Sequence, residues 1–523
     1  MHDRQHNELS SGVSAPNRSL QKRSKSIGRG AEAPKQFEAH QIVAKTVPAD
    51  TSTGRFISSS REAAKFFICQ YHTSPQHQQR KPQNSVHQSR ANPTMFKFFN
   101  NPILDFELTR LLGSTSAGGC DTAEFLTAAS KIKKNDPESW HAAWKEQGER
   151  AEAIAKDAAK NGLNAMAKNG YLRASNYFRA ASYLFLNDDA RVVPLSERSV
   201  EAFVRATAFM EGEVRLVDVP YENGVSMPAY LYLPPPEARL PGKIPLLLYF
   251  SGADSTKEEL HFLFGYSGPQ LGYAVLLLEG PGQGLLLKKS GVPLRPDFEV
   301  VANKVLGFLE NLAQSQPELQ LDLDRIAVAG AVTGGYFALR AATDSRVKAC
   351  VSIDPFFSMF DLAMTRVPQS FVSLWKGGWV TKEMFNLIAS LQSWWSFQIR
   401  WELGLGVSSM GVGSPGMMLR RLEDFSLDTK KDGKILNRVT CPVLLTGPGG
   451  GAEMYSSAES GAVKIHKLLT KVPEGNKELW TPSEPADGGL SASIGAWPLL
   501  AQRSFLFLDK HFAIVRKIVL ESK

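Results

Sequence analysis

The stretch RIAVAGAVTGGYFALRAATD, Arg325 to Asp344, reads as a buried strand, a sharp glycine turn and a helix. Gly330 ends the strand and Gly334 opens the helix, which is the spacing of a G-x-S-x-G nucleophile elbow. The central position, where such an elbow carries its serine, is Val332. Valine has no nucleophilic atom, so the stretch predicts the backbone of an elbow without its nucleophile.

The conformation of this turn is a second question. The elbow position normally has a positive φ, which is a genuine outlier for a β-branched residue. Holding Val332 in that conformation would cost roughly 1–3 kcal/mol. We therefore expect the turn to have relaxed to an ordinary negative φ at Val332.

Apolar segments of strand length alternate with helical segments on both sides of the elbow. Before them, the dipeptide Asn223-Gly224 joins two alternating segments, which is a strong hairpin signal. This pattern predicts an α/β fold with a mostly parallel sheet, helices on both faces and an antiparallel hairpin at its start. Ligands bind such sheets at the carboxyl ends of the strands. The strand segments are KIPLLLYFSG (243–252), GYAVLLLEG (272–280), RIAVAG (325–330), VKACVSID (347–354) and TCPVLLTG (440–447).

Composition and periodicity divide the chain into three parts. Residues 1–94 are rich in Ser, Gln and Asn, which predicts a disordered basic extension, with a transit peptide as the alternative. Residues 95–210 show helical periodicity and helix start signals, which predicts a helical N-terminal domain. Residues 211–523 form the predicted α/β core, with a lid inserted at about 356–438.

The formal net charge of +8 belongs to the extension. Residues 1–94 hold 14 Lys/Arg against 6 Asp/Glu, so the rest of the chain is neutral. A neutral folded part disfavours a basic groove, and we expect no nucleic-acid partner. No apolar run approaches the ~20 residues of a membrane-spanning helix.

The sequence also bounds the compartment and the cofactors. Four cysteines without paired metal spacing fit a reducing, cytoplasmic compartment. The motif GPGQG (280–284) lacks the G-x-x-x-x-G-K-S/T spacing of a phosphate-binding loop. We therefore expect no cofactor and no metal.

Several motifs together resemble a known family. GAVTGGY (330–336), SGADSTKEE (251–259) and GPGQG are similar to the turns of the α/β-hydrolase fold. MFKFF (95–99), YLRASNYFRAA (171–181) and FLDKHF (507–512) look like fungal hydrolases with a helical N-terminal domain, the group of the fusarin and cytochalasan pathways. The resemblance runs from about Met95 to the end. It implies an enzyme of secondary metabolism that acts on a product of a polyketide or hybrid polyketide–peptide synthase.

A serine hydrolase needs a nucleophile, an acid and a histidine base, in that chain order in this fold. The loop after the last strand, TPSEPADGGLSASIG, contains no histidine. In the folded part, His466 and His511 lie in helical runs, where surface or packing roles suit them. The nucleophile is missing, and no base is evident.

Three residues remain as catalytic candidates. Asp254 follows a strand beside the expected oxyanion position, and Glu453 is the one carboxylate that follows PVLLTG. Thr333 adjoins the elbow, although it also fits an ordinary helix start. Thr256 and Glu259 have the spacing of a capping box, so we expect them to cap a helix.

Substrate binding is predicted at the elbow, at the turn after the first core strand, and in the lid. The lid holds five of the nine tryptophans, and aromatic side chains suit a large apolar ligand. Packing within the lid is the alternative for each of them. The expected substrate-binding residues are Gly252, Ala253, Gly330, Val332, Gly334, Trp375, Trp394 and Trp395.

Two classes of function remain open. The first is an enzyme that acts on an apolar, polyketide-derived intermediate, either as a hydrolase or by promoting dehydration, condensation or ring closure without a covalent step. The second is a catalytically dead hydrolase fold that binds a ligand or a protein. A homodimer is a further expectation.

Overall fold

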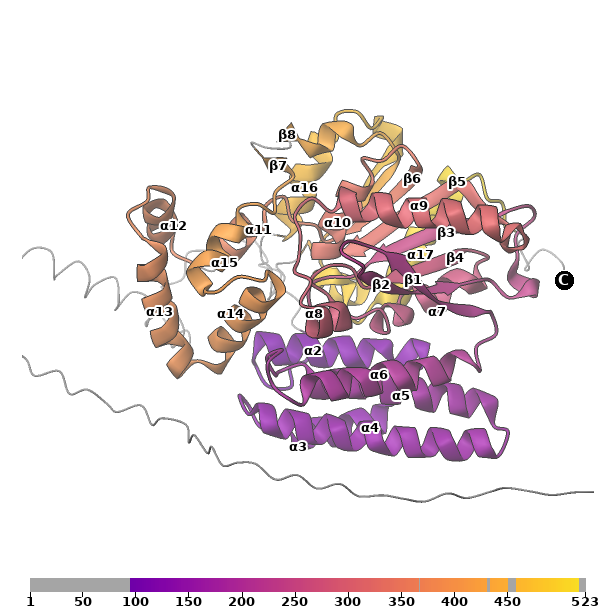
Figure 1. Cartoon of the computed structure of the whole chain (residues 1–523), viewed down its shortest axis with the longest axis horizontal. Coiled ribbons are helices and arrows are strands. Elements are labelled where there is room, and N and C mark those ends of the chain that lie inside the picture. The colour runs from indigo at the N-terminus through magenta and orange to yellow at the C-terminus, as the bar shows by residue number, and fades with distance from the viewer. Residues whose placement is uncertain (1–94, 366, 430–432, 450–457, 517–523) are drawn as a thin grey trace, which may run out of the picture. The chain divides into compact units, whose positions relative to one another are not determined.

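The computed structural model describes residues 95–365, 367–429, 433–449 and 458–516. The predicted extension (1–94) and the candidate Glu453 lie outside these residues. Figure 1 shows a layer of helices beneath a central sheet, with further helices on the sheet and a helical lid on the left.

The N-terminal part of the described chain is helical. Asp121 and Asp136 each accept two backbone N–H bonds at a helix start, and Pro137 opens the longest helix, as the start signals predicted. Trp140 and Trp144 are fully buried in the core of this layer. The helices are α2 (Pro102–Gly113), α3 (Thr122–Lys131), α4 (Pro137–Lys160), α5 (Asn164–Ser182) and α6 (Val192–Thr207), with a 3₁₀ turn η1 (Ser114–Ala117).

An eight-stranded sheet follows in the order β1-β2-β4-β3-β5-β6-β9-β10. Strands β1 and β2 form the expected hairpin, in which Asn223 and Gly224 both have positive φ. β2 also pairs antiparallel with β4, and the other pairings are parallel. This order confirms the α/β-hydrolase fold. The strands are β1 (Val214–Pro220), β2 (Ser226–Tyr232), β3 (Ile244–Phe250), β4 (Ala274–Leu278), β5 (Leu321–Ala331), β6 (Val347–Ile353), β9 (Val443–Thr446) and β10 (Lys477–Trp480).

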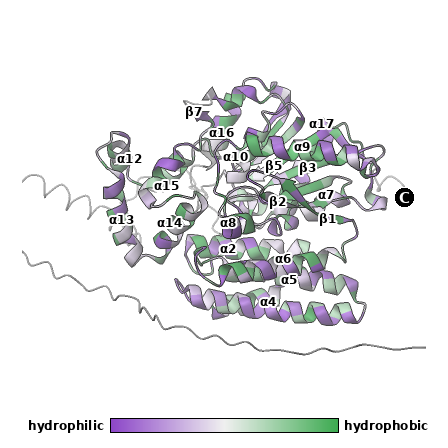
Figure 2. Cartoon of the chain, viewed as in Figure 1, coloured by the Kyte–Doolittle hydropathy of each residue, from purple (hydrophilic) through white to green (hydrophobic). Residues whose placement is uncertain are grey.

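Helices cover both faces of the sheet because successive strand side chains point to opposite sides. On one face, Leu247 and Tyr249 of β3 join a core with α7 and α17. On the other, Phe250 contacts Phe298, which stacks on Phe337 of α10. Figure 2 shows the apolar strands between these layers. The helices are α7 (Phe264–Gln270), α8 (Gly284–Ser290), α9 (Glu299–Ser315), α10 (Thr333–Ala341), α16 (Ala458–Leu468) and α17 (Trp497–His511).

The segment between β6 and β9, predicted to be a lid and called the lid below, is mostly helical (Figure 1). Its fourth helix is tied to the helical layer, because Trp401 Nε1 donates to Tyr183 O at 2.9 Å and Asn187 Nδ2 donates to Ser408 Oγ at 2.7 Å. The lid elements are α11 (Met359–Met364), α12 (Gln369–Lys376), α13 (Lys382–Trp395), α14 (Phe397–Ser409), α15 (Pro415–Leu422), β7 (Asp428–Thr429), β8 (Gly433–Lys434) and the 3₁₀ turn η5 (Ile435–Arg438).

Short 3₁₀ turns connect the remaining elements. They are η2 (Pro236–Ala238), η3 (Glu259–Phe262), η4 (Pro317–Leu319), η6 (Glu474–Asn476), η7 (Pro485–Asp487) and η8 (Ser491–Ser493). Within the part of the chain that the structure describes, every helix is too short or too polar to cross a bilayer.

Two glycines let β5 and α10 pack against each other at the elbow. A Cβ on Gly330 would lie 2.1 Å from the carbonyl oxygen of Gly334, and a Cβ on Gly334 would lie 2.3 Å from that of Phe250. Backbone atoms cannot move aside as a flexible side chain can. The elbow therefore requires glycine at both positions.

The close approach of backbone atoms at Gly334 predicts how an added methyl group would change stability. Gly334→Ala should lower the free energy of unfolding by about 3 kcal/mol or more, because the added Cβ overlaps backbone. The control is Gly307→Ala in α9, where a Cβ meets nothing within 4 Å. That variant should be more stable by roughly 0.5–1 kcal/mol, the helix preference of alanine over glycine. Equal effects of the two changes in urea unfolding would contradict the packing described.

Candidate active site

The elbow keeps the strained conformation that we expected it to lose. Val332 has φ 52° and ψ −105°, so the predicted relaxation is wrong. Its N–H donates to Ile353 O at 2.9 Å and its carbonyl accepts from Tyr336 N at 3.1 Å. These bonds and the glycine contacts fix both ends of the turn, which leaves valine no alternative conformation.

Thr333 is the first residue of α10 and is buried. The helix has no side-chain cap, and Thr333 adjoins the strained turn as the elbow geometry requires. In a strand–turn–helix elbow, the N–H of this residue serves the oxyanion hole. The structure thus keeps the backbone of the elbow beside a residue that cannot attack.

A buried carboxyl group that the sequence analysis did not single out lies at the next strand end. Asp354 directly follows β6, which pairs with β5, and its side chain is 2% exposed. Its Oδ2 accepts from Ser491 Oγ at 2.5 Å and from Ala492 N at 3.0 Å. Its Oδ1 is buried and has no hydrogen-bond partner among the described residues. Ser491 and Ala492 belong to the loop in which a hydrolase of this fold carries its histidine.

Strained backbone conformations occur on both sides of the contact between Asp354 and Ser491. Asp354 has φ 50°, and Ala492 and Ser493 have φ 53° and 49°. Strained residues of this kind persist where the surroundings fix them, often at active sites. Burial raises the pKa of Asp354 to about 7, although the bonds from Ser491 and Ala492 oppose the shift. A carboxyl with such a pKa can both take and return a proton near neutral pH.

The raised pKa makes stability depend on pH in a defined direction. A carboxyl whose pKa rises from 3.8 to about 7 on folding stabilises the fold most below pH 3.8. That contribution is lost as the pH rises toward 7. Between pH 5 and pH 8, Asp354→Asn should therefore gain about 2 kcal/mol of unfolding free energy relative to the wild type.

The control for this measurement is Asp254→Asn. The pKa of Asp254 is lowered, so its contribution is lost only as the pH falls below the ordinary value of 3.8. Its effect on urea unfolding should be the same at pH 5 and pH 8. An effect of Asp354→Asn that does not change with pH would disprove the assignment of a raised pKa.

Asp254 is engaged in a link between the core and the helical layer. Its Oδ2 accepts from Arg110 Nη1 at 2.9 Å and from Tyr183 Oη at 3.3 Å. Burial opposes its ionisation, but the Arg110 guanidinium outweighs burial and lowers the pKa. Asp254 is therefore a carboxylate at neutral pH and is a poor general acid.

The predicted capping box is wrong. The carboxylate of Glu259 forms a short hydrogen bond with Arg110 and does not return to Thr256. Thr256 Oγ1 is buried and has no hydrogen-bond partner within the described ranges. The arginine is 149 residues away in sequence, so local spacing could not reveal it.

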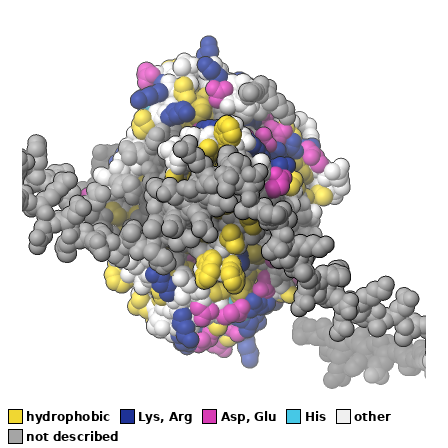
Figure 3. All heavy atoms as spheres, turned by 90° about the vertical axis from the view of Figure 1, so that its left-hand side faces the viewer, with side chains coloured by type: hydrophobic (Ala, Val, Ile, Leu, Met, Phe, Trp, Pro, Cys, Tyr) yellow, Lys and Arg dark blue, Asp and Glu magenta, His cyan; other side chains and the backbone are white. Residues whose placement is uncertain are grey.

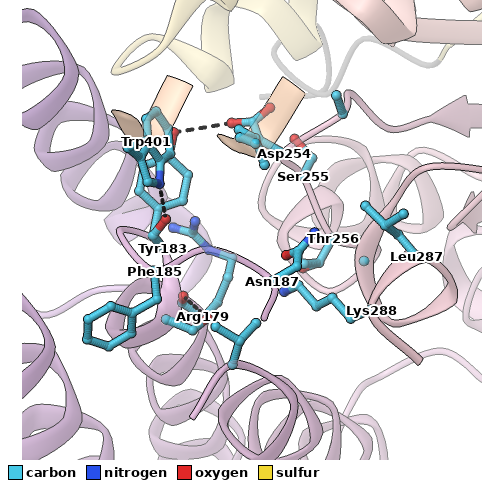
Figure 4. A pocket seen from close by; sticks show the side chains of 15 residues that line it. Arg179, Tyr183, Phe185, Asn187, Asp254, Ser255, Thr256, Leu287, Lys288 and Trp401 are labelled. Atoms are coloured by element: carbon cyan, nitrogen blue, oxygen red, sulfur yellow. Dashed lines mark hydrogen bonds between the residues drawn. The ribbon is translucent and has the colours of Figure 1, made fainter. Parts of the chain in front are cut away.

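A cavity lies where the helical layer, the loop after β3, α8 and α14 meet (Figure 4). The space free of protein atoms there is about 540 Å³, a volume that includes open solvent. Its apolar wall is formed by Phe185, Val192, Leu287, Trp401 and Leu405. Its polar side includes Arg179, Tyr183, Asp254, Thr256 and Lys288, and Ala253 adjoins it, as expected of a residue in that loop.

The three tryptophans proposed for substrate binding lie elsewhere. Trp375 is fully buried within the lid, where its Nε1 donates to Glu423 Oε1 at 2.9 Å. Trp394 and Trp395 are 78% and 81% exposed at the end of α13. Figure 3 views the molecule from this side and shows hydrophobic side chains at the surface. The tryptophan that does line the cavity is Trp401.

The described histidines do not supply the missing base. His141 contacts Ala181 O, and His261 contacts Tyr232 Oη. His466 lies in α16, and His511, in the last turn of α17, packs on Phe507. Within the described residues, none of the four hydrogen-bonds to a carboxylate. No group of three or more His, Cys, Asp or Glu residues within these ranges could hold a metal ion.

Comparison with known proteins shows the family and supports the fold. The model of the family "Esterase FrsA-like" matches residues 135–374. The 2,6-dihydroxy-pseudo-oxynicotine hydrolase has a similar structure, with a TM-score of 0.57 and 20% identity, covering 77% of this chain and 96% of that one. This likeness supports the α/β-hydrolase fold.

Relatives found by sequence have a higher identity to this chain than that hydrolase has. The alpha/beta hydrolase gkaG of Penicillium citrinum is 63% identical over 81% of this chain and 99% of its own length. The alpha/beta hydrolase xenA of Xenoacremonium sinensis is 62% identical over 81% of this chain and all of its own. The chain belongs to this family of fungal alpha/beta hydrolases.

Proposed function

We propose that this protein is an enzyme of fungal secondary metabolism that promotes ring closure of a polyketide-derived intermediate without a covalent enzyme intermediate. The observation that carries the proposal is Val332, which holds an elbow conformation although it cannot act as a nucleophile. Hydrolysis by a serine triad needs a nucleophile and a histidine. An oxyanion site and an acid–base group suffice for carbon–carbon condensation.

In the proposed reaction, Asp354 removes a proton from a carbon between two carbonyl groups. The negative charge moves onto oxygen, where the N–H of Thr333 and the start of α10 stabilise it. The carbanion attacks an aldehyde or ketone carbon in the same molecule, and a new C–C bond forms. Asp354 then returns the proton through Ser491 to the new alkoxide, which becomes a hydroxyl. Asp354 next removes the second proton of the same carbon, the C=C bond forms as the C–O bond breaks, and this proton goes to the departing hydroxyl, which leaves as water.

The other predicted site residues have supporting roles in this proposal. Asp254, bonded to Tyr183 and Arg110, positions the substrate at the rim of the cavity. Gly252 and Ala253 allow the substrate to approach the backbone after β3, while Gly330 and Gly334 act indirectly, because they let the elbow pack closely against the sheet. Glu453, outside the described residues, stays a sequence-based candidate. The apolar residues that line the cavity would hold a polyketide chain.

A ligand-binding module without catalytic activity is the second candidate. The observation that favours it is that Asp254, the strongest catalytic candidate in the sequence, is neutralised by Arg110. The buried carboxyl of Asp354, one oxygen of which has no hydrogen-bond partner in the described part of the chain, favours the enzyme. A homodimer and a cytoplasmic location stay predictions from the sequence.

The test uses a synthetic β-ketoamide that carries an aldehyde and closes a ring with loss of one water. Wild-type protein should accelerate this reaction and should not be labelled by a fluorophosphonate. Asp354→Asn should slow product formation by about 100-fold or more, the usual contribution of an acid–base group. The matched control is Asp361→Asn, an exposed lid carboxylate, which should retain wild-type activity.

Each other outcome is decisive. Covalent labelling of the wild type would mean that a nucleophile exists and would restore hydrolysis as the first candidate. Binding of the β-ketoamide with no acceleration would favour the binding module. Equal rates for wild type and Asp354→Asn would remove Asp354 from the reaction.

A further inference from the structure

Hydrogen-bond donors without partners converge on the cavity between the helical layer and the core. Arg179 of α5 is 6% exposed. Its Nε donates to Asn176 Oδ1 at 3.1 Å, and its Nη2 donates to Glu107 Oε1 at 2.6 Å. Its third nitrogen, Nη1, is buried and has no partner among the described residues. An unpaired guanidinium N–H in such a place is costly, and a ligand or a water must satisfy it.

Two more donors line the same space. Thr256 Oγ1 is buried and unpaired within the described chain, and Thr256 lines the main cavity and a smaller adjoining one, together with Arg179 and Lys288. Lys288 Nζ donates to Ser196 Oγ at 2.9 Å. An ammonium has three donors, so this bond leaves Lys288 able to bind another acceptor. Figure 4 shows Arg179, Thr256 and Lys288 around one opening.

The carboxylates near these donors already have cationic partners. Glu107 and Glu259 each contact both Arg110 and Arg179. On the other side, Lys257 lies 2.8 Å from Glu258 and 3.5 Å from Glu279. Burial raises the pKa of Glu107 and of Glu279, which favours their neutral forms. The cavity thus offers donors on cationic side chains, and the carboxylates around it lie beside cations, although Glu259 Oε1 has no hydrogen-bond partner among the described residues.

We propose that Arg179, Thr256 and Lys288 form a subsite for the acidic 1,3-dicarbonyl head group of the substrate, bound through its oxygens. A head group that offers two oxygens and carries negative charge matches three donors, two of which are cationic. Apolar side chains that line the same cavity, which include Phe185, Leu287 and Trp401, would hold a hydrocarbon chain. The class of substrate comes from the proposed function, so the subsite rests on that proposal. The subsite adds the identity of the residues that recognise the head group.

Binding is measured separately from catalysis, with three probes that share one chain. They are 2-decanoylcyclohexane-1,3-dione, decanoate and decanol, titrated calorimetrically into the full-length protein at pH 7.5. The dione should bind about 10-fold or more tightly than decanol, because only its oxygens carry charge to the donors. Thr256→Val should weaken dione binding by about 5-fold, and Lys288→Met by about 10-fold. Neither change should alter decanol binding.

The variants are chosen so that folding does not obscure the result. Thr256→Val removes a hydroxyl that has no hydrogen-bond partner among the described residues, so it should leave thermal stability unchanged or raise it. The matched control is Lys289→Met, which removes the neighbouring lysine that pairs with exposed Glu197, and it should not change dione affinity.

Three results would overturn the subsite. They are equal binding of dione and decanol, tighter binding of decanoate than of the dione, and equal weakening of all probes by Thr256→Val. Failure of the proposed reaction looks different: the β-ketoamide would show no acceleration while head-group-dependent binding persisted.

Discussion

The rest of the site depends on the close approach of two backbones where β5 turns into α10. At Gly330 the carbonyl oxygen of Gly334 occupies the space that a Cβ would need, and at Gly334 the carbonyl oxygen of Phe250 does so. With both ends fixed, the residue between them must take a positive φ. The constraint acts on the backbone alone, so it applies whether that residue is serine or valine. This is why the elbow persists at Val332 at a cost of about 1–3 kcal/mol.

A second constraint places the helical layer against the strand ends. Arg110 and Arg179 come from helices α2 and α5, and they reach Asp254, Ser255 and Glu259 in the loop after β3. Removing one member of a buried ion pair leaves a charge unpaired, which costs about 3–5 kcal/mol. The network therefore fixes the cavity between the layers, and the helical layer is part of the site.

Local signals in the sequence predicted much of the fold. Asn223-Gly224 gave the hairpin, Asp121 and Pro137 marked helix starts, and the apolar strands gave the α/β class, because each depends on neighbouring residues. The site was less predictable. Asp354 contacts Ser491, which lies 137 residues further along the chain. Arg110 contacts Asp254, which lies 144 residues further along. No spacing rule reports such contacts, although a buried strand that ends in an acidic residue, as in VKACVSID, is a signal for inspection.

The conformation of Val332 shows why the prediction of a relaxed turn failed. That prediction considered the residue's own preference, which favours a negative φ. Relaxation would require Val332 to give up its bond to Ile353 or Gly334 to move away from Phe250. Each move would separate α10 from the sheet and expose buried core residues such as Phe337. Burial of one such side chain contributes about 1.5–3 kcal/mol of stability. Several such losses exceed the strain at one residue. The packing of the whole helix thus decides the backbone at the elbow, and the chain can change the side chain at position 332 while it keeps the conformation of the turn.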